Sequence, residues 1–161
     1  KGDIYNQIDI EKALKNQDVV VSCLGSWGTK SKNVVSTATK NIIPVMEQAE
    51  IKRFVSVTGA AAKLPKENFN FLESLNRKLL SIVGGKILKD AEEHLRLLCN
   101  SKLDWTAVRS PVMSSSSKSR YHLTHSQPKP WTRVSRKSVC LAMLYLIENK
   151  AFYSEAPYIS N

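Results

Sequence analysis

Three short apolar runs, each ending at a turn of small residues, constrain the fold of this chain more than any other feature. They occupy residues 18–25, 53–60 and 105–111, and each is rich in β-branched residues and follows a stretch with helical periodicity. Such runs are typical of strands buried on both faces of a parallel sheet, which long crossovers connect. Because ligands of open parallel sheets bind at the carboxyl ends of the strands, we expect the functional site where these turns meet.

Length and composition favour a single domain over residues 1–161 with a core of its own, since 42% of the residues are hydrophobic. No apolar run approaches the ~18 residues of a membrane span, and no signal segment opens the chain. Neither the three cysteines nor the three histidines have the spacing of a metal site, so no metal is expected. Unpaired thiols of this kind indicate a reducing, cytoplasmic setting.

Helical periodicity fills most of the chain between the strands. Asp9 is a plausible N-cap for a first short helix, and Ser135 for the last one. A helix over residues 32–49 contains Pro44, which predicts a kink there. Two further helices are predicted over residues 69–83 and 86–100, with Gly84-Gly85 as the stop between them. Short strands are predicted over residues 121–124 and 158–159, and the alternation indicates an α/β fold.

Taken in order, these segments resemble the atypical short-chain dehydrogenase/reductases, in particular the NmrA-like NAD(P)H-binding proteins and the biliverdin-IXβ reductase and flavin reductase group. Besides the three strand-like runs, the resemblance depends on Gly2-Asp3 and on residues 134–136, and it covers almost the whole chain. It implies a Rossmann-type α/β fold, which is a doubly wound and mainly parallel sheet with helices on both faces. It also implies NADP(H), or else NAD(H), as the cofactor.

The resemblance also implies which residues would contact the cofactor. In that arrangement Asp3 and Ile4 would contact the adenine, and Leu24, Gly25 and Ser26 would contact the ribose and pyrophosphate. Thr58 and Gly59 would contact the nicotinamide, and Pro111, Val112 and Met113 its amide. Small residues at strand ends let backbone amides approach an anionic, planar ligand closely. Taken singly, each glycine is equally well explained as the end of a strand.

The chain departs from this family at the phosphate-binding loop. It contains no Gly-x-x-Gly-x-x-Gly motif, which in the family precedes the position of Lys1. We therefore expect an N-terminally truncated domain, the C-terminal three-quarters of a Rossmann fold. Without that loop the pyrophosphate lacks its nest of N–H donors, so the sequence as given is expected to bind the cofactor weakly.

A second departure concerns the Ser–Tyr–Lys set of typical short-chain dehydrogenases. Gly59 and Gly85 occupy the serine and tyrosine places, whereas Lys89 fits the lysine place. Thr58 and Lys89 are therefore the catalytic candidates, although a lysine on a helix surface is commonly only solvated. An acceptor that needs no acid from the protein, such as a flavin, could still be reduced through proximity to the cofactor.

Three functions follow from these patterns. The first is an oxidoreductase that transfers hydride from NADPH to a small planar substrate such as a flavin. The second is a non-catalytic NAD(P) sensor or scaffold of the NmrA-like type, which would act through a protein partner. The third, a nucleic-acid-associated protein, draws on the net charge of +10, but the basic residues are scattered and no nucleic-acid motif accompanies them.

Overall fold

A central sheet of five strands organises the computed structural model, which describes residues 1–68 and 71–161, with the backbone alone for 71–83. In sheet order, the strands are β1 (Val19–Ser22), β2 (Arg53–Gly59), β3 (Asp104–Ser110), β7 (Tyr158–Ser160) and β5 (His122–Thr124). The first four run parallel, and β5 is antiparallel to β7. The prediction that the three apolar runs lie side by side in one direction is confirmed.

The register brings the ends of these strands to one edge of the sheet. Gly59 lies opposite Ser110 at the end of the β2–β3 pair. Just beyond it, the amide of Ala60 donates to the carbonyl of Ser110 at 2.8 Å. The segments that follow β1, β2 and β3 therefore leave the sheet on the same side, which is where a parallel sheet places its ligands.

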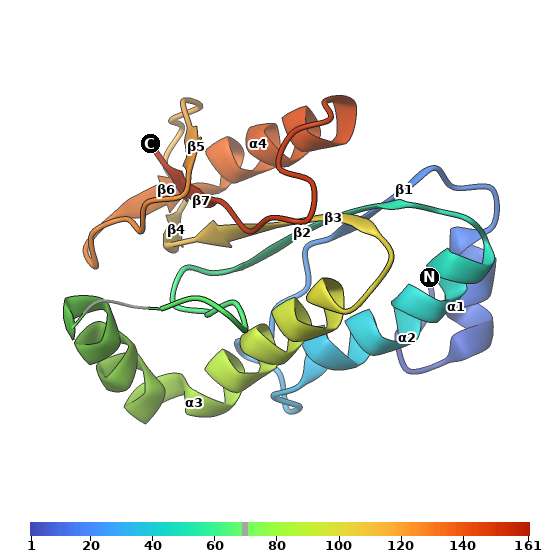
Figure 1. Ribbon diagram of the computed structural model, residues 1–161, viewed down its shortest axis with the longest axis horizontal. Helices are drawn as coiled ribbons and strands as arrows, with labels where there is room; N and C mark the ends of the chain where they lie inside the picture. The colour runs from blue at the N-terminus through green and yellow to red at the C-terminus, as the bar shows by residue number, and fades with distance from the viewer. Residues whose placement is uncertain (69–70) are drawn as a thin grey trace.

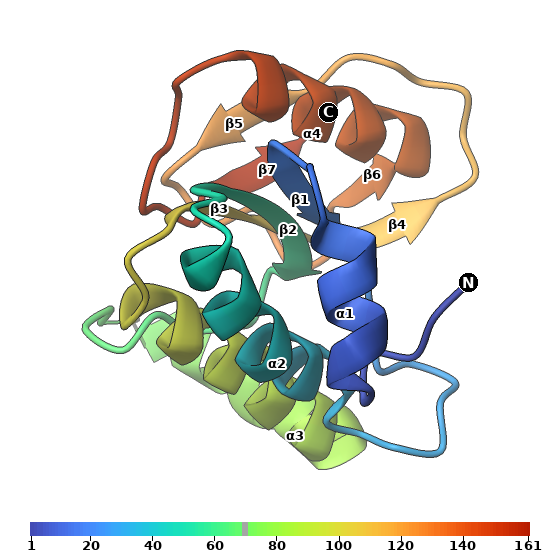
Figure 2. The same cartoon turned by 90° about the vertical axis from the view of Figure 1, so that its right-hand side faces the viewer.

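Helices cover both faces of the sheet, as Figure 1 shows. On one face lie α1 (Gln7–Leu14), α2 (Val34–Gln48) and α3 (Phe71–Cys99), and on the other lies α4 (Arg136–Glu148). Two short strands, β4 (Val112–Ser114) and β6 (Arg133–Ser135), pair in parallel as a separate small sheet. Figure 2, turned by 90°, shows α1 and α2 in front of α3 beneath the sheet.

Each face of the sheet buries its own apolar core. On the α1–α3 face, Phe54 and Trp105 of the sheet pack with Met46, Leu95 and Leu98 of the helices. On the α4 face the core is formed by Val55, Val108, Val134, Val139, Ala142, Met143, Leu146 and Ile159. Alternate residues of β2 and β3 thus serve both cores, as the near-continuous hydrophobic runs of the sequence predict.

The predicted break between two helical segments is confirmed. The helices predicted over residues 69–83 and 86–100 correspond to α3, which consists of two helices that meet at a kink where Gly84 has a non-helical backbone (φ −138°, ψ 30°). Phe69 and Asn70 lie outside the described residues, as do the side chains of the apolar face predicted over 72–82. Glycine tolerates such a distorted backbone, so the two helices follow each other without a loop between them.

Of the two predicted helix N-caps, one is confirmed and one is wrong. Ser135 caps α4, because its side chain accepts the amide hydrogen of Ser138. The cap of α1 is Asn6, whose Oδ1 accepts the amide hydrogen of Ile8 at 3.0 Å, whereas Asp9 lies inside the first turn. Helix α2 continues through Pro44, which is solvent-exposed. Because proline has no N–H, the carbonyl one turn earlier lacks its helical partner, and on this exposed side of the helix water can replace it.

Candidate functional site

The ends of β1 and β2 open onto free space. Gly25 and Gly59 are both exposed, and a Cβ atom built on either one meets no heavy atom within 4 Å. Both glycines have a backbone that other residues also adopt, so they are not required there by strain. A flat group could therefore lie against the main chain at both strand ends, which is the space that the base or nicotinamide of a dinucleotide needs.

Thr58 and the segment after β3 flank this opening. Thr58 is 9% exposed and lies opposite Arg109 in the register of β2 and β3. Beyond Pro111 the chain continues at once into β4, where the side chain of Val112 is 65% exposed and that of Met113 is half-buried. Sequence reasoning missed β4 and β6, which pair with each other outside the main sheet.

The loop after β1 is tied to α3 by a buried hydrogen bond. Ser26 is 2% exposed, and its hydroxyl donates to Oδ2 of Asp90 at 2.5 Å. Leu24, in the same segment, is half-buried. Because the Ser26 hydroxyl is already engaged, a ligand at this place would meet the main chain of the loop in preference to that side chain.

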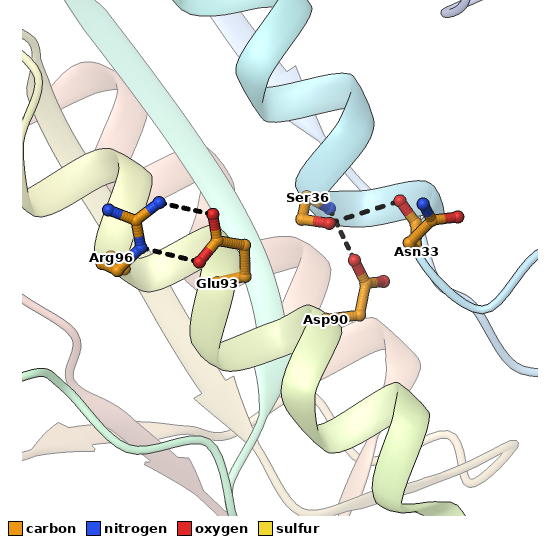
Figure 3. Close-up of polar contacts among 5 residues, drawn as sticks. All are labelled: Asn33, Ser36, Asp90, Glu93 and Arg96. Atoms are coloured by element: carbon orange, nitrogen blue, oxygen red, sulfur yellow. Dashed lines mark hydrogen bonds and ion pairs between the residues drawn. The ribbon is translucent and has the colours of Figure 1, made fainter.

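Asp90 joins α3 to the start of α2. Its carboxylate accepts the amide hydrogens of Val35 (3.1 Å to Oδ2) and Ser36 (2.8 Å to Oδ1), while it is itself only 4% exposed. Figure 3 shows Asp90 pointing from α3 to the first turn of α2, beside Asn33 and Ser36. A carboxylate at a helix N-terminus accepts hydrogen bonds from amides that have no partner within the helix, and its negative charge is attracted to the positive end of the helix dipole. The carboxylate thus fixes where the loop after β1 enters α2.

His94, one turn further along α3, is fully buried between α2 and β2. Its Nδ1 lies 2.7 Å from Oγ1 of Thr39, and its Nε2 lies 2.9 Å from Oγ of Ser56. Burial lowers the pKa of His94 from 6.5 to about 4, although the nearby charge of Asp90 opposes this shift. The ring is therefore neutral at pH 7 and serves the interior as one donor and one acceptor.

The remaining predicted site residues lie on the segment before α1 and on α3. Asp3 and Ile4 lie against α1 and α2, where the amide of Asp3 donates to Asp9 and the carbonyl of Ile4 accepts Nδ2 of Asn41. Lys89 is exposed on α3 and lines two cavities, of about 520 and 480 Å³. The residues that line these two cavities do not include Thr58.

Two buried arginines, which the sequence gave no reason to single out, brace the sheet. Arg109 forms an ion pair with Glu67 at 2.6 Å and stacks 3.8 Å from the ring centre of Tyr158. It thereby fastens the loop after β2 to the last strand. Arg53 donates to the carbonyl of Leu146 near the end of α4, and burial lowers its pKa. Arg53 lies at the start of β2 and Arg109 near the end of β3, so each arginine fixes the position of a strand end.

Within the described ranges 1–68 and 71–161, no three His, Cys, Asp or Glu side chains are placed to hold a metal ion. Over that same part of the chain, none of the helices has the length and apolar character that a membrane crossing requires.

Comparison with known proteins gives a family and a fold. A family model described as NAD(P)H-binding matches residues 1–150. A search of curated proteins gives no match. Among solved structures, a short-chain dehydrogenase/reductase of Veillonella parvula DSM 2008 in complex with NADP is similar, with a TM-score of 0.76, 16% identity, and coverage of 99% of this chain and 70% of that one.

Two further structures show the same architecture. The anaerobillin reductase ChuY of Escherichia coli O157:H7 has a TM-score of 0.79 at 16% identity, over 99% of this chain and 72% of its own. A Rossmann-fold NAD(P)-binding family protein of Shigella flexneri has a TM-score of 0.64 at 20% identity, over 99% and 68%. Identities this low establish the fold alone, and they confirm the Rossmann-type prediction.

Proposed function

The chain belongs to the NAD(P)H-binding family, and from that premise we propose that it is an oxidoreductase that reduces a small planar acceptor, such as a flavin, with NADPH. The cofactor, when bound, supplies the hydride and becomes oxidised, while the acceptor gains the hydride and takes its proton from water. We assign this reaction to the carboxyl edge of β1, β2 and β3, and to the cytoplasm.

The observation that carries this proposal is the open space in front of Gly25 and Gly59 at adjacent strand ends. In this proposal the nicotinamide lies against the Gly59 main chain beside Thr58, and the segment from Pro111 to Met113 borders its amide. The chain has a glycine, Gly85, four residues before Lys89, so it offers no tyrosine acid there. Its chemistry suits an acceptor that needs orientation against the cofactor more than it needs an acid from the protein.

A bulky side chain at Gly59 tests this placement. Gly59→Val fills the space in front of β2 without meeting another atom, and its backbone accepts a β-branched residue, so the fold is expected to survive. We expect the affinity for NADPH to fall at least about tenfold. The affinity is measured by fluorescence titration with NADPH, on a protein that includes any native residues preceding Lys1. Val112→Ala, a change at an exposed side chain, tests whether the segment after β3 contributes. Unchanged NADPH affinity in Gly59→Val would exclude this binding mode.

A sensor without catalysis is the second candidate, and one observation favours it. Thr58 is absent from the residues that line the two cavities beside Lys89, so these cavities do not join the two residues that the family pattern suggests. Consumption of NADPH with flavin as acceptor separates the two functions. Tight NADPH binding with no acceptor-dependent oxidation would support the sensor and a role through a protein partner.

A further inference from the structure

A cluster of lysines gathers beside the proposed cofactor edge, where α3 faces the loop after β1. The cavity of about 480 Å³ between them is lined by Lys30, Lys32, Asn33, Ser36, Lys86, Lys89, Asp90 and Glu93. We call this cavity the lysine pocket. Its two walls are held together by the hydrogen bonds from Ser26 and from the first turn of α2 to Asp90, so the lysines of loop and helix are kept facing the same space.

The acidic members of the lysine pocket are already hydrogen-bonded by groups other than the lysines. The Asp90 carboxylate receives two amides of α2 and one hydroxyl. Glu93 is bound by both the Nε and NH2 groups of Arg96, at 2.7 and 2.6 Å, as Figure 3 shows, and this contact lowers its pKa. Its negative charge is therefore directed away from the lysines.

The lysines, in contrast, keep their charge available. Lys30, Lys86 and Lys89 are exposed, and within the ranges whose side chains the structure describes no carboxylate pairs with any of them. Lys32 donates to the carbonyl of Thr29, which leaves its charge uncompensated. Lys86 and Lys89 stand three residues apart on one face of α3. Four cations around one cavity repel one another unless an anion lies between them.

We propose that the lysine pocket is the subsite for an anionic group of the substrate, a phosphate or a carboxylate. This inference rests on the proposed function, since the pocket shares Lys89 with the candidate site and begins at the loop that leaves β1. Ammonium groups on flexible stems bind such groups as point charges. The volume of about 480 Å³ is that of a site for a metabolite. The acceptor is therefore a planar molecule that carries at least one phosphate or carboxylate arm.

The site is tested first without any turnover. Inorganic pyrophosphate and citrate serve as probes of the two anion chemistries, and their binding is measured by calorimetry at low salt. In the variant Lys30→Gln/Lys86→Gln, we expect the affinity for the preferred probe to fall about tenfold. The matched control, Lys137→Gln/Lys150→Gln, removes the same charge on and just beyond α4, across the sheet, and is expected to leave affinity within about twofold.

Each outcome decides the proposal. Equal losses in the two double variants, or no binding of either probe to the unaltered protein, would overturn it. It would also be overturned if the probes compete with NADPH and the pocket variant loses NADPH affinity in parallel, because the pocket would then belong to the cofactor. If the probes bind in the pocket but NADPH does not bind at all, the proposed function fails and the anion site stands alone.

Discussion

At the scale of single residues, the packing of the protein interior depends on buried polar side chains that no sequence pattern indicates. His94 is enclosed by Thr39 on α2 and Ser56 on β2, and it links the two through its ring nitrogens. Such a group is stable only while it is neutral, because protonation would place a charge in the core and remove its acceptor nitrogen. Protonation of this ring is therefore expected to destabilise the fold in acid.

We expect the protein to lose stability as the pH falls from about 6.5 to about 4. In this window the unfolded chain binds a proton at His94 and the folded chain does not, so the free energy of unfolding decreases, by about 3 kcal/mol at the lower end. Below pH 4 both states are protonated and the effect stops growing. Urea unfolding of the protein and of His94→Gln, across this range, measures the difference. Parallel pH profiles for the two would show that another group is responsible.

At the scale of elements, the start of α2 is held from a distance. Helices usually carry their own cap, but Asn33 makes no side-chain cap for α2, and Asp90 of α3 supplies the carboxylate. The same carboxylate holds Ser26 of the loop after β1. One residue thus sets both the beginning of a helix and the wall of the lysine pocket.

Removal of that carboxylate should be costly. Asp90→Ala would leave the amides of Val35 and Ser36 and the hydroxyl of Ser26 without their acceptor, which we expect to lower the free energy of unfolding by about 3 kcal/mol. Asp90→Asn keeps one acceptor and should cost about half as much. Asp9→Ala removes an acceptor at the exposed start of the chain and should stay within about 1 kcal/mol. Denaturant unfolding gives all three values, and a neutral Asp90→Ala would remove the capping role.

The sequence predicted the elements that long local patterns specify, and it missed those that distant contacts create. The three strands were found because β2 and β3 are buried on both faces and so carry continuous apolar runs. The break at Gly84-Gly85 was also foreseeable, because two glycines interrupt the helical pattern where α3 has its kink. At the candidate site the strand-end glycines were foreseeable from their turns. The links from Asp90 and His94 join residues between 38 and 64 positions apart, and no pattern in one sequence records them.

At the scale of the whole molecule, the two edges of the sheet differ in how they are protected. Strand β5 is short and closes one edge, whereas at the other β1 pairs with β2 alone among the residues that the structure describes. Val21 of β1 is 44% exposed, so an apolar side chain lies next to unpaired backbone groups. Such an edge can recruit strands from other molecules.

A charge at this edge should reduce self-association. Val21→Lys places an ammonium group on the exposed side of β1, where it opposes the approach of a second, equally positive molecule, since the net charge is already +10. We expect less aggregate in light scattering at equal concentration, with stability within about 0.5 kcal/mol of the parent. Leu144→Lys, a similar change at a 50%-exposed position of α4, controls for added charge alone. If both variants reduce scattering equally, net charge is the cause and the open edge of β1 is not the site of association.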